Sequence, residues 1–395
     1  MPISRLYCSP FMKDLHNCDA RQDYVSSENL KIKAVPNGFI FPLTEAKYGA
    51  RFGGVTNHDY TFVRESLPAR SHPWYMEKTP VKEQYSGRDF DCHDIKSFHM
   101  DEDVVFAGQL HNHLGHFMTE GLSRLWALLN PEFKYSKVVF IATEPSKFAV
   151  QALRMFAEKL QINFDNFIFV VRAPIKFRTI YIPEPSIRMH DFCHENYKHV
   201  VDIFKSSVEP GEYKKIYLSK VGSTSQRAGG EQLFIELFAD NGYKPIALND
   251  LQPNELFSLM KGCNSLVATS GTASHQSIFM EDNQHCVCLN RSAHVHPLQT
   301  MINRVRGHKE EYIDVFLRST KEHFGDQPCF IFPTKQLYQY FQENSFSIDL
   351  QAVAKNALLK RTLESEERLF NWLHRTGTIT FEDTLRKNNL AFTYK

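Results

Sequence analysis

Apolar positions along this chain form short runs that alternate with segments of helical spacing. Runs with the composition of buried strands lie at residues 104–106, 137–142, 167–171, 177–183, 216–219, 244–248, 265–268 and 285–289. Between these runs apolar residues recur every three to four positions, at residues 148–160, 191–204, 231–239, 253–260 and 274–280. Strands that alternate with helices pair in parallel and are covered on both faces, so the pattern predicts an α/β fold.

From residue 214 onward the alternation is regular enough to predict a domain of its own. The elements follow in a βαβαβαβ series, which is typical of a doubly wound, nucleotide-binding domain. The Pro-Gly pair in segment 208–212 is the best candidate for the boundary before it. We therefore expect an N-terminal α/β domain at residues 1–208, a C-terminal domain at 209–345, and a packing helix and tail at 346–395.

The first hundred residues show no such regularity. Segment 35–41 predicts a hairpin that turns at Asn37–Gly38. The Gly-rich segment 48–54 has neither the Lys-Ser/Thr ending nor the strand–helix frame of a phosphate loop, so we interpret it as a connection. Three histidines lie among charged residues and are expected at the surface: His72, His93 and His99.

The stretch 108–129 gathers more reactive side chains than any other. It follows the predicted strand at 104–106 and then takes helical spacing, with polar residues His111, Asn112, His113, His116 and Glu120 near its start. On a helix His116 and Glu120 lie one turn apart, and Glu120 shares a face with Arg124 and could pair with it. This arrangement predicts a substrate site at a helix start. A buried helix whose polar residues merely cap its start is the alternative.

Two loops at strand ends in the C-terminal half are candidates for binding phosphate. One follows a strand and opens a helix, and it consists of Ser270, Gly271, Thr272, Ala273 and Ser274. Such small residues let backbone N–H groups and a helix dipole meet a diphosphate. The loop is not a G-x-G-x-x-G sequence, so a dinucleotide is not indicated.

The second loop follows Ser219 and Lys220, with Arg227 within reach. A lysine and an arginine at one sheet edge can screen the charge of a leaving diphosphate without a metal. A solvated turn is the alternative here. Glu255, on the helix that begins at residue 253, could accept hydrogen bonds from the hydroxyls of a ribose. A surface glutamate is the alternative.

Composition limits the classes of partner. A chain of 395 residues favours two domains, and 42% hydrophobic with 23% charged residues is ordinary globular composition. A net charge of +1 argues against a nucleic-acid-binding surface but allows a local basic pocket. No run of about 18 apolar residues is present, so no membrane span is expected. Eight scattered cysteines without a secretory signal indicate reduced thiols and a cytoplasmic location.

The assembled pattern resembles glycosyltransferase family 61, a family of inverting sugar transferases, over roughly residues 30–310. The first family motif is matched by Gly115, His116, Phe117, Glu120, Arg124 and Leu125. Glu120 replaces the usual aspartate, and His113 replaces the usual asparagine, with Asn112 one residue early. Ser219–Lys220 stands where the family has Ser-Arg. Of the family's later His-Gly-Ala-Gly-Leu-Thr-Asn motif, only Gly271 is kept as it stands.

The resemblance implies a GT-B architecture, in which two Rossmann-like domains face each other across a cleft. It implies a UDP-sugar as the usual donor. We expect no separate cofactor and no metal, and a glycan or glycolipid as acceptor. A bacterial enzyme of capsule, lipopolysaccharide or other surface polysaccharide synthesis fits this description. We expect such an enzyme in the cytoplasm, with peripheral association at the inner face of the membrane as a variant.

Inverting transfer needs a base for the acceptor hydroxyl and positive charge or N–H donors for the leaving diphosphate. We expect the N-terminal domain to supply the base and the acceptor side, and the C-terminal domain to hold the nucleotide-sugar. Glu120 is the favoured base with His116 as its partner, and the reverse assignment stays open. Acceptor-side residues are His113, Asn112 and Arg124. Donor-side residues are Ser219, Lys220, Arg227, Glu255 and the loop 270–274.

Two other functions remain as alternatives. His111, His113 and His116 have the spacing of a metal-dependent hydrolase, although Gly115 stands where that motif needs an aspartate. A non-catalytic glycan-binding protein on the same fold is the second alternative, and the altered loop at 270–276 supports it.

Overall fold

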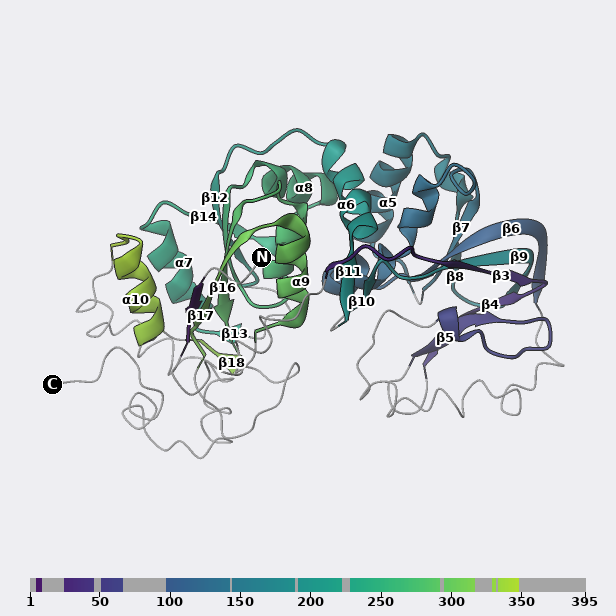
Figure 1. Cartoon of the computed structure of the whole chain (residues 1–395), viewed down its shortest axis with the longest axis horizontal. Helices are drawn as coiled ribbons and strands as arrows, with labels where there is room; N and C mark the ends of the chain where they lie inside the picture. Colours follow the sequence, from purple (N-terminus) through teal and green to yellow (C-terminus); the bar gives the residue numbers. More distant parts are fainter. Residues whose placement is uncertain are drawn as a thin grey trace, which may run out of the picture. The chain divides into compact units, whose positions relative to one another are not determined.

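The computed structural model describes residues 5–8, 25–45, 51–66, 97–142, 144–188, 191–221, 228–291, 295–316, 329–331 and 333–347. These residues form two compact units, each built on a sheet of its own (Figure 1). The mixed-sheet unit holds the described residues from 25 to 209, together with 252–257. The parallel-sheet unit holds residues 5–8, 210–251 and the described residues from 258 onward.

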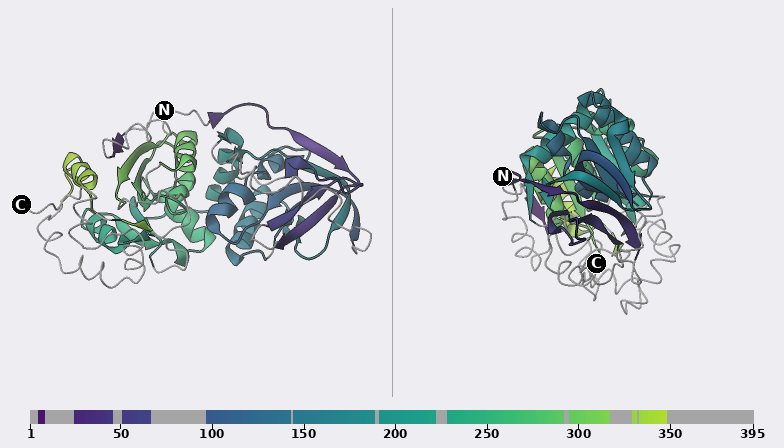
Figure 2. Two further views of the ribbon diagram at one scale, coloured as in Figure 1. Left: turned by 90° about the horizontal axis from the view of Figure 1, so that it is seen from below. Right: turned by 90° about the vertical axis from the view of Figure 1, so that its right-hand side faces the viewer.

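The mixed-sheet unit has the strand order β5-β4-β9-β6-β7-β8, with β3 also on β9. Its strands are β3 (Ile32–Pro36), β4 (Phe39–Glu45), β5 (Arg51–Thr56), β6 (Phe98–Gln109), β7 (Lys137–Ile141), β8 (Phe167–Val170) and β9 (Ile175–Pro183). The four strands β9, β6, β7 and β8 pair in parallel, as the pattern predicted, while β3, β4 and β5 pair antiparallel. Figure 2 shows the purple N-terminal strands beside the blue and teal ones.

Strand β6 lies in the middle of this sheet and leads to the residues of chemical interest. Its second half is apolar and fully buried, with Val104 and Phe106 packed against Val139, Phe177 and Ile180. Helices α5 (Lys147–Leu160) and α6 (Glu195–Ser206) pack against each other through stacked Phe156 and Phe204 rings. A short sheet of β2 (Val25–Ser26), β10 (Ile187–Arg188) and β11 (Phe192–His194) completes the unit.

The prediction of a hairpin at residues 35–41 is wrong. Strands β3 and β4 do not pair with each other, and both pair antiparallel with β9 in one register that continues across Asn37–Gly38. A type I′ hairpin turn needs positive φ at both central residues, and here only Asn37 has it, at 54°. The Asn37 N–H donates to the carbonyl of Arg178 at 2.7 Å, so the chain twists once and stays on β9.

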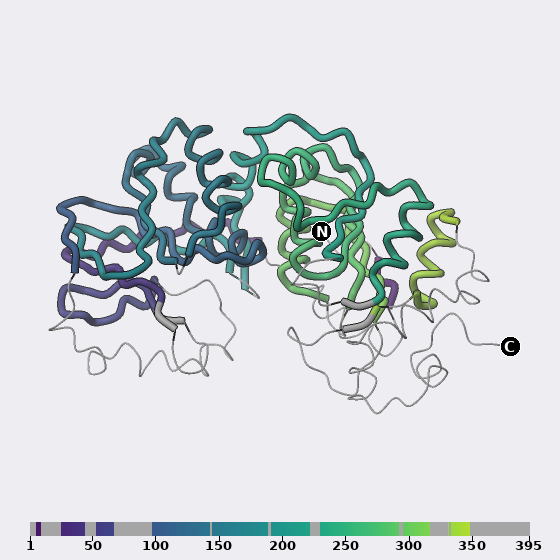
Figure 3. The backbone as a smooth tube through the Cα atoms, turned by 180° about the vertical axis from the view of Figure 1, so that it is seen from behind, coloured from purple at the N-terminus to yellow at the C-terminus, as the bar shows by residue number. Residues whose placement is uncertain are grey.

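The parallel-sheet unit has the strand order β1-β17-β16-β15-β12-β14, and every pair is parallel. Its strands are β1 (Arg5–Tyr7), β12 (Lys215–Ser219), β14 (Lys244–Ala247), β15 (Ser265–Thr269), β16 (His285–Asn290) and β17 (Lys309–Asp314). The tube in Figure 3 shows the teal and green strands of this sheet side by side. The parallel sheet expected from residue 214 onward is therefore confirmed.

Helices cover both faces of the parallel sheet. Helix α7 (Glu231–Ala239) and helix α10 (Lys335–Glu343) share one face, where Phe238 contacts Phe341, and α9 (Pro297–Arg306) lies on the other (Figure 1). Helix α8 (Pro253–Gly262) follows β14, and η7 (Ser274–Phe279) is a 3₁₀ helix where an α-helix was expected. A two-stranded sheet joins β13 (Ala228–Gly229) to β18 (Cys329–Phe330).

Strand β1 and the first residues of β5 differ from what the sequence predicts. Strand β1 pairs with β17, so residues 5–7 lie in the parallel-sheet unit and not in the N-terminal domain expected for residues 1–208. Residues 51–54 open strand β5 and are not a connection. The tail helix, His72 and His93 lie outside the described residues, whereas His99 is exposed on β6, as expected.

In the part of the chain that the structure describes, no helix combines the length and the apolar character needed to cross a membrane. Five cysteines of the described residues are free thiols: Cys8, Cys193, Cys263, Cys286 and Cys288.

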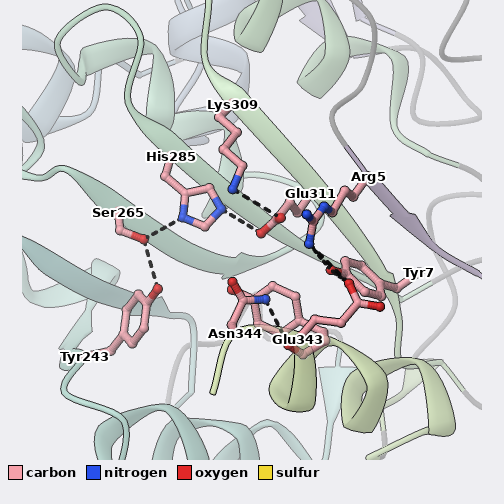
Figure 4. Close-up of polar contacts among 10 residues, drawn as sticks. Arg5, Tyr7, Tyr243, Ser265, His285, Lys309, Glu311, Glu343 and Asn344 are labelled. Carbon is pink, nitrogen blue, oxygen red and sulfur yellow. Dashed lines mark hydrogen bonds and ion pairs between the residues drawn. The ribbon is translucent and has the colours of Figure 1, made fainter. Parts of the chain in front are cut away.

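A polar network ties together the amino ends of the strands in the parallel sheet (Figure 4). Glu311 on β17 is fully buried, and its carboxylate lies 2.7 Å from His285 Nε2 and 3.5 Å from Lys309 Nζ. His285 Nδ1 lies 3.1 Å from the Ser265 hydroxyl, which is 2.9 Å from the Tyr243 hydroxyl. These contacts hold β15, β16 and β17 in register because a buried carboxylate is stable only when it is paired.

Substituting Glu311→Gln tests this network. Burial raises the pKa of the Glu311 carboxyl. The hydrogen bond and the charge of His285 lower this pKa by more than burial raises it, so the net pKa lies below the ordinary value of 4.5. A carboxylate of this kind stabilises the fold above its unfolded pKa and loses that effect as pH falls through the folded pKa. We expect the substitution to lower the free energy of unfolding by about 2 kcal/mol at pH 7 and by less below about pH 4.

Urea titration at several pH values measures this difference. Glu343→Gln is the control, because Glu343 is a partly exposed carboxylate that bonds Arg5 and Tyr7 and should cost less than about 1 kcal/mol. Equal stability of wild type and Glu311→Gln at every pH would show that the network does not hold the strands.

Candidate functional site

The segment after β6 is helical, but it is not the single α-helix that was expected at residues 108–129. It consists of three short pieces: α4 (Leu114–His116), the π-helical η3 (Phe117–Gly121) and the 3₁₀ helix η4 (Leu125–Leu129). In the π turn the N–H of Leu122 donates to the carbonyl of Phe117, five residues back. Single π turns inside helices are frequent at functional sites. The predicted apolar stripe is nevertheless buried, including Phe117, Leu122 and Leu125.

Glu120 is the centre of a group of three side chains that we call the His–Glu cluster: His111, His116 and Glu120. Glu120 is only 3% exposed. One carboxylate oxygen lies 2.6 Å from His111 Nε2, and the other lies 3.1 Å from His116 Nδ1. The predicted proximity of His116 and Glu120 is thus present, and His111 is an additional partner that spacing alone did not suggest.

The two histidines of the cluster differ in exposure. The side chain of His111 is 9% exposed, whereas that of His116 is 35% exposed. The centroid of the His116 ring is 4.9 Å from that of His111 and 5.2 Å from that of His113. His113 and Asn112 are both exposed, and His113 Nδ1 accepts a hydrogen bond from the N–H of Gly115, which caps α4.

Arg124 lies beneath the cluster rather than at its surface. Its guanidinium donates to the carbonyls of Pro183 and Glu65, the latter at 2.9 Å, and it lies over the Phe106 ring. Burial, together with the nearby charge of Arg188, lowers the pKa of Arg124 to about 9. These contacts join the end of β9 to the segment before residue 67, so Arg124 holds the backbone here, and the acceptor-side role expected for it stays a prediction.

Gly108 makes room for this buried arginine. It has φ of 92°, a backbone conformation that favours glycine, and a Cβ added there would stand 3.4 Å from Arg124 Nε.

In the parallel-sheet unit the candidate loops follow two adjacent strands. Leu218 on β12 pairs with Ala268 on β15, so the carboxyl ends of both strands lie side by side at one end of the sheet, called here the switch edge. The chain leaves β12 toward β14 on one side and then returns to β15 on the other, which makes this edge the topological switch point. Ligands of doubly wound sheets bind at such points.

The residues expected at this edge are placed differently from one another. Ser219 is buried, and its hydroxyl accepts a hydrogen bond from the N–H of Val221, while Lys220 is half-buried beside it. Arg227 lies outside the described residues. Glu255 is exposed and caps its own helix by accepting from the N–H of Gln252 at 2.7 Å, which agrees with the surface alternative.

The loop 270–274 is closed by hydrogen bonds of its own. The Ser274 hydroxyl accepts from the N–H of Gly271 and donates to its carbonyl, and the N–H of Ser270 donates to the carbonyl of Leu289. Thr272 alone among the five is half-buried; Ala273 and the others are buried. The backbone N–H groups of Ser270 and Gly271 are therefore engaged within the unit, and the expectation of a diphosphate site at this loop stays a prediction.

Most of these residues fall in one recognised family region, whereas His111, Asn112 and His113 lie just before it. Residues 114–288 match the family model described as Glycosyltransferase 61. This region belongs to glycosyltransferase family 61. No curated protein matches the chain. Family membership indicates a glycosyltransferase, with a sugar donor and an acceptor as its substrates, and it confirms the resemblance inferred from the motifs around Glu120 and Gly271.

The alternative of a metal-dependent hydrolase has no support. Among the described residues no three histidines, cysteines or acidic side chains are arranged to hold a metal ion. His111 and His116 each have a ring nitrogen within hydrogen-bond distance of the Glu120 carboxylate, and His113 uses Nδ1 to cap α4.

Two further residues of the parallel-sheet unit were missed by sequence reasoning. Arg291 directly follows β16, and its Nε donates to the carbonyl of Ser270 at 2.6 Å. Glu231 begins α7 and is 1% exposed; burial raises its pKa to about 7, against the opposing effects of Tyr217, Lys220 and Arg291. The rule that strand ends carry ligands could have identified Arg291, because it follows a predicted strand.

The structural role of Arg124 can be tested with Arg124→Lys. A lysine cannot donate to two carbonyls in a fixed fork, so we expect the free energy of unfolding to fall by about 2 kcal/mol. Thermal or urea unfolding measures this, with Arg154→Lys, an exposed arginine over the Phe164 ring, as the matched control. Normal stability of Arg124→Lys combined with a raised KM for the acceptor would support the acceptor-side role.

Proposed function

We propose that this protein is an inverting glycosyltransferase that moves a sugar from a nucleotide-sugar, a UDP-sugar in the first instance, to a hydroxyl of a glycan acceptor. The observation that carries the proposal is the His–Glu cluster, in which the half-exposed His116 bonds the buried carboxylate of Glu120. The parallel-sheet unit supports the donor side, because its switch point carries Lys220 and the loop 270–274.

The burial of Glu120 favours His116 as the base. Both carboxylate oxygens of Glu120 are engaged by histidine nitrogens, and the residue is almost fully buried. His116 is the most exposed member of the cluster, and its Nδ1 faces the carboxylate, so a proton would be taken up at Nε2. A carboxylate that orients an imidazole and stabilises its protonated form is an established arrangement in acyl transfer. Glu120 then acts through His116, reversing the order favoured from spacing.

The proposed step is a single displacement. The acceptor oxygen bonds to the anomeric carbon from the face opposite the nucleotide while its proton passes to His116 Nε2. The bond between the anomeric carbon and the diphosphate oxygen breaks, and the diphosphate leaves with the electron pair. Positive side chains at the switch point, including Lys220, offset the charge that develops there, so the proposal includes no metal.

A GT-B arrangement belongs to the same proposal. In it the mixed-sheet unit presents the acceptor to the donor held by the parallel-sheet unit, with His113 and Asn112 on the acceptor side. The cellular setting that we propose is cytoplasmic synthesis of a surface polysaccharide such as capsule or lipopolysaccharide, on a glycan or glycolipid acceptor.

Ligand-dependent stability of the full chain tests the donor class. A nucleotide that binds only the folded protein raises the melting temperature by mass action. We expect UDP and UDP-sugars to do so equally with and without a chelator. Absence of stabilisation by every nucleoside diphosphate would contradict the proposal, and stabilisation without transfer to any acceptor would favour the non-catalytic glycan-binding alternative.

Substitution of the cluster tests the base. We expect His116→Ala and Glu120→Gln each to lower kcat/KM by about 10²- to 10⁴-fold, since a positioned general base contributes this much. Progress curves with a UDP-sugar measure it. His99→Gln removes an exposed histidine of the same strand that leads to the cluster and should leave kcat/KM unchanged. Near-normal transfer in both cluster variants would show that the base lies elsewhere.

A further inference from the structure

The loop 270–274 lacks part of what a diphosphate site needs. The N–H groups of Ser270 and Gly271 are used inside the unit, and η7 after them is a 3₁₀ helix of six residues. A helix this short and irregular adds little dipole of its own. Charge for an anionic ligand at this edge must therefore come from side chains.

Arg291 reaches the loop from the neighbouring strand. Thr269 at the end of β15 pairs with Leu289 on β16, so the residues after both strands run on along the same edge. Arg291 Nε donates to the carbonyl of Ser270 at 2.6 Å. This bond fixes the direction of the guanidinium.

The backbone of Gly271 lies close to the same guanidinium. Its φ of 123° favours glycine, and a Cβ added there would stand 3.4 Å from Arg291 Nη2. Gly271 is also the residue of the later family motif that this chain keeps. The guanidinium thus lies directly against the backbone at the point where the loop leaves β15.

Lys220 brings a second positive charge to the edge. It follows β12, the strand on the opposite side of β15 from β16. The charges of Lys220 and Arg291 both act on the buried Glu231 carboxylate, and both lower a pKa that burial has raised. Two cations that follow β12 and β16 therefore act on the same buried carboxylate.

We propose that Arg291 binds the diphosphate of the donor at the carboxyl ends of β12, β15 and β16, in place of the loop's backbone N–H groups. A guanidinium presents paired donors that match phosphate oxygens, and it stays charged as the diphosphate leaves. Lys220 assists as a point charge from the other side. The inference rests on the proposed function for the identity of the ligand, a nucleoside diphosphate.

Calorimetric titration of the full chain with UDP, UMP, uridine and inorganic pyrophosphate tests the inference. For Arg291→Ala we expect UDP and pyrophosphate to bind about 10- to 100-fold more weakly, with uridine unchanged, which is the loss typical of hydrogen bonds to a charged group. The UDP affinity of Arg291→Lys should lie between those of the wild type and Arg291→Ala, because a lysine keeps the charge but lacks the paired donors of a guanidinium. A merely structural role would weaken all the ligands alike.

Gly271→Ala provides a second route to the same result. Its added methyl strains the backbone at a φ of 123° and contacts the guanidinium, so diphosphate affinity should fall while Arg291 is still present. Arg5→Ala is the control, because it removes an equal charge from an exposed position, 51% accessible, on β1 of the same unit. Melting curves without ligand show whether each variant is folded.

The outcomes separate this inference from the proposed function. Equal UDP affinity of wild type and Arg291→Ala overturns the inference and leaves the transferase proposal in place. Pyrophosphate binding that depends on Arg291, without any nucleotide binding, supports the anion site and overturns the nucleotide-sugar donor. No binding of UDP or pyrophosphate by the wild type overturns both.

Discussion

A carboxylate removed from water must be paired, and the region around β6 depends on how Glu120 meets this requirement. Glu120 is paired at both oxygens, by one histidine before the helical segment and one within it. The backbone between them is irregular, with a single α turn followed by a π turn. Arg124, held by two carbonyls beneath the segment, keeps this irregular backbone in place. The position of His116 thus follows from the burial of its partner.

The parallel sheet imposes a different constraint. Its strand order sends the chain to opposite sides after β12 and after β15, so loops from both strands separate at one edge. Side chains that follow β12, β15 and β16 are consequently gathered there without any long insertion. At the opposite end of the sheet the starts of β16 and β17 are tied by Glu311 and His285, a network that stabilises the register.

Much of the fold could be predicted because its signals are local. The alternation of apolar runs and helical spacing identified every strand from β6 to β16 that belongs to the two large sheets. The spacing of His116 and Glu120 in the sequence correctly predicted that their side chains lie close together. The errors came from long-range pairing. Strand β3 continues into β4 because β9, far along the chain, accepts both, and β1 joins β17 across the whole sequence.

The site was harder to predict than the fold for the same reason. His111 is nine residues from Glu120, and no helical period relates them; only the turn after β6 brings them within 2.6 Å. The loop 270–274 suggested a backbone phosphate site, but composition does not reveal that Ser274 closes it. Arg291 is a single arginine after a strand, and its role depends on the pairing of β15 with β16.

The two units carry different kinds of chemistry, and this division fits a displacement with a poor nucleophile and a charged leaving group. Taking a proton from a hydroxyl needs a group that can change its charge near neutral pH, and imidazole is the side chain that does so. Holding a departing diphosphate needs charge that does not change, which a guanidinium provides. In the reaction that we propose, the mixed-sheet unit contributes the imidazole on a buried carboxylate, and the parallel-sheet unit contributes the guanidinium that follows a strand. Neither group could replace the other, because a permanently charged side chain cannot accept the proton and a titrating one would lose its hold on the phosphate as pH rises.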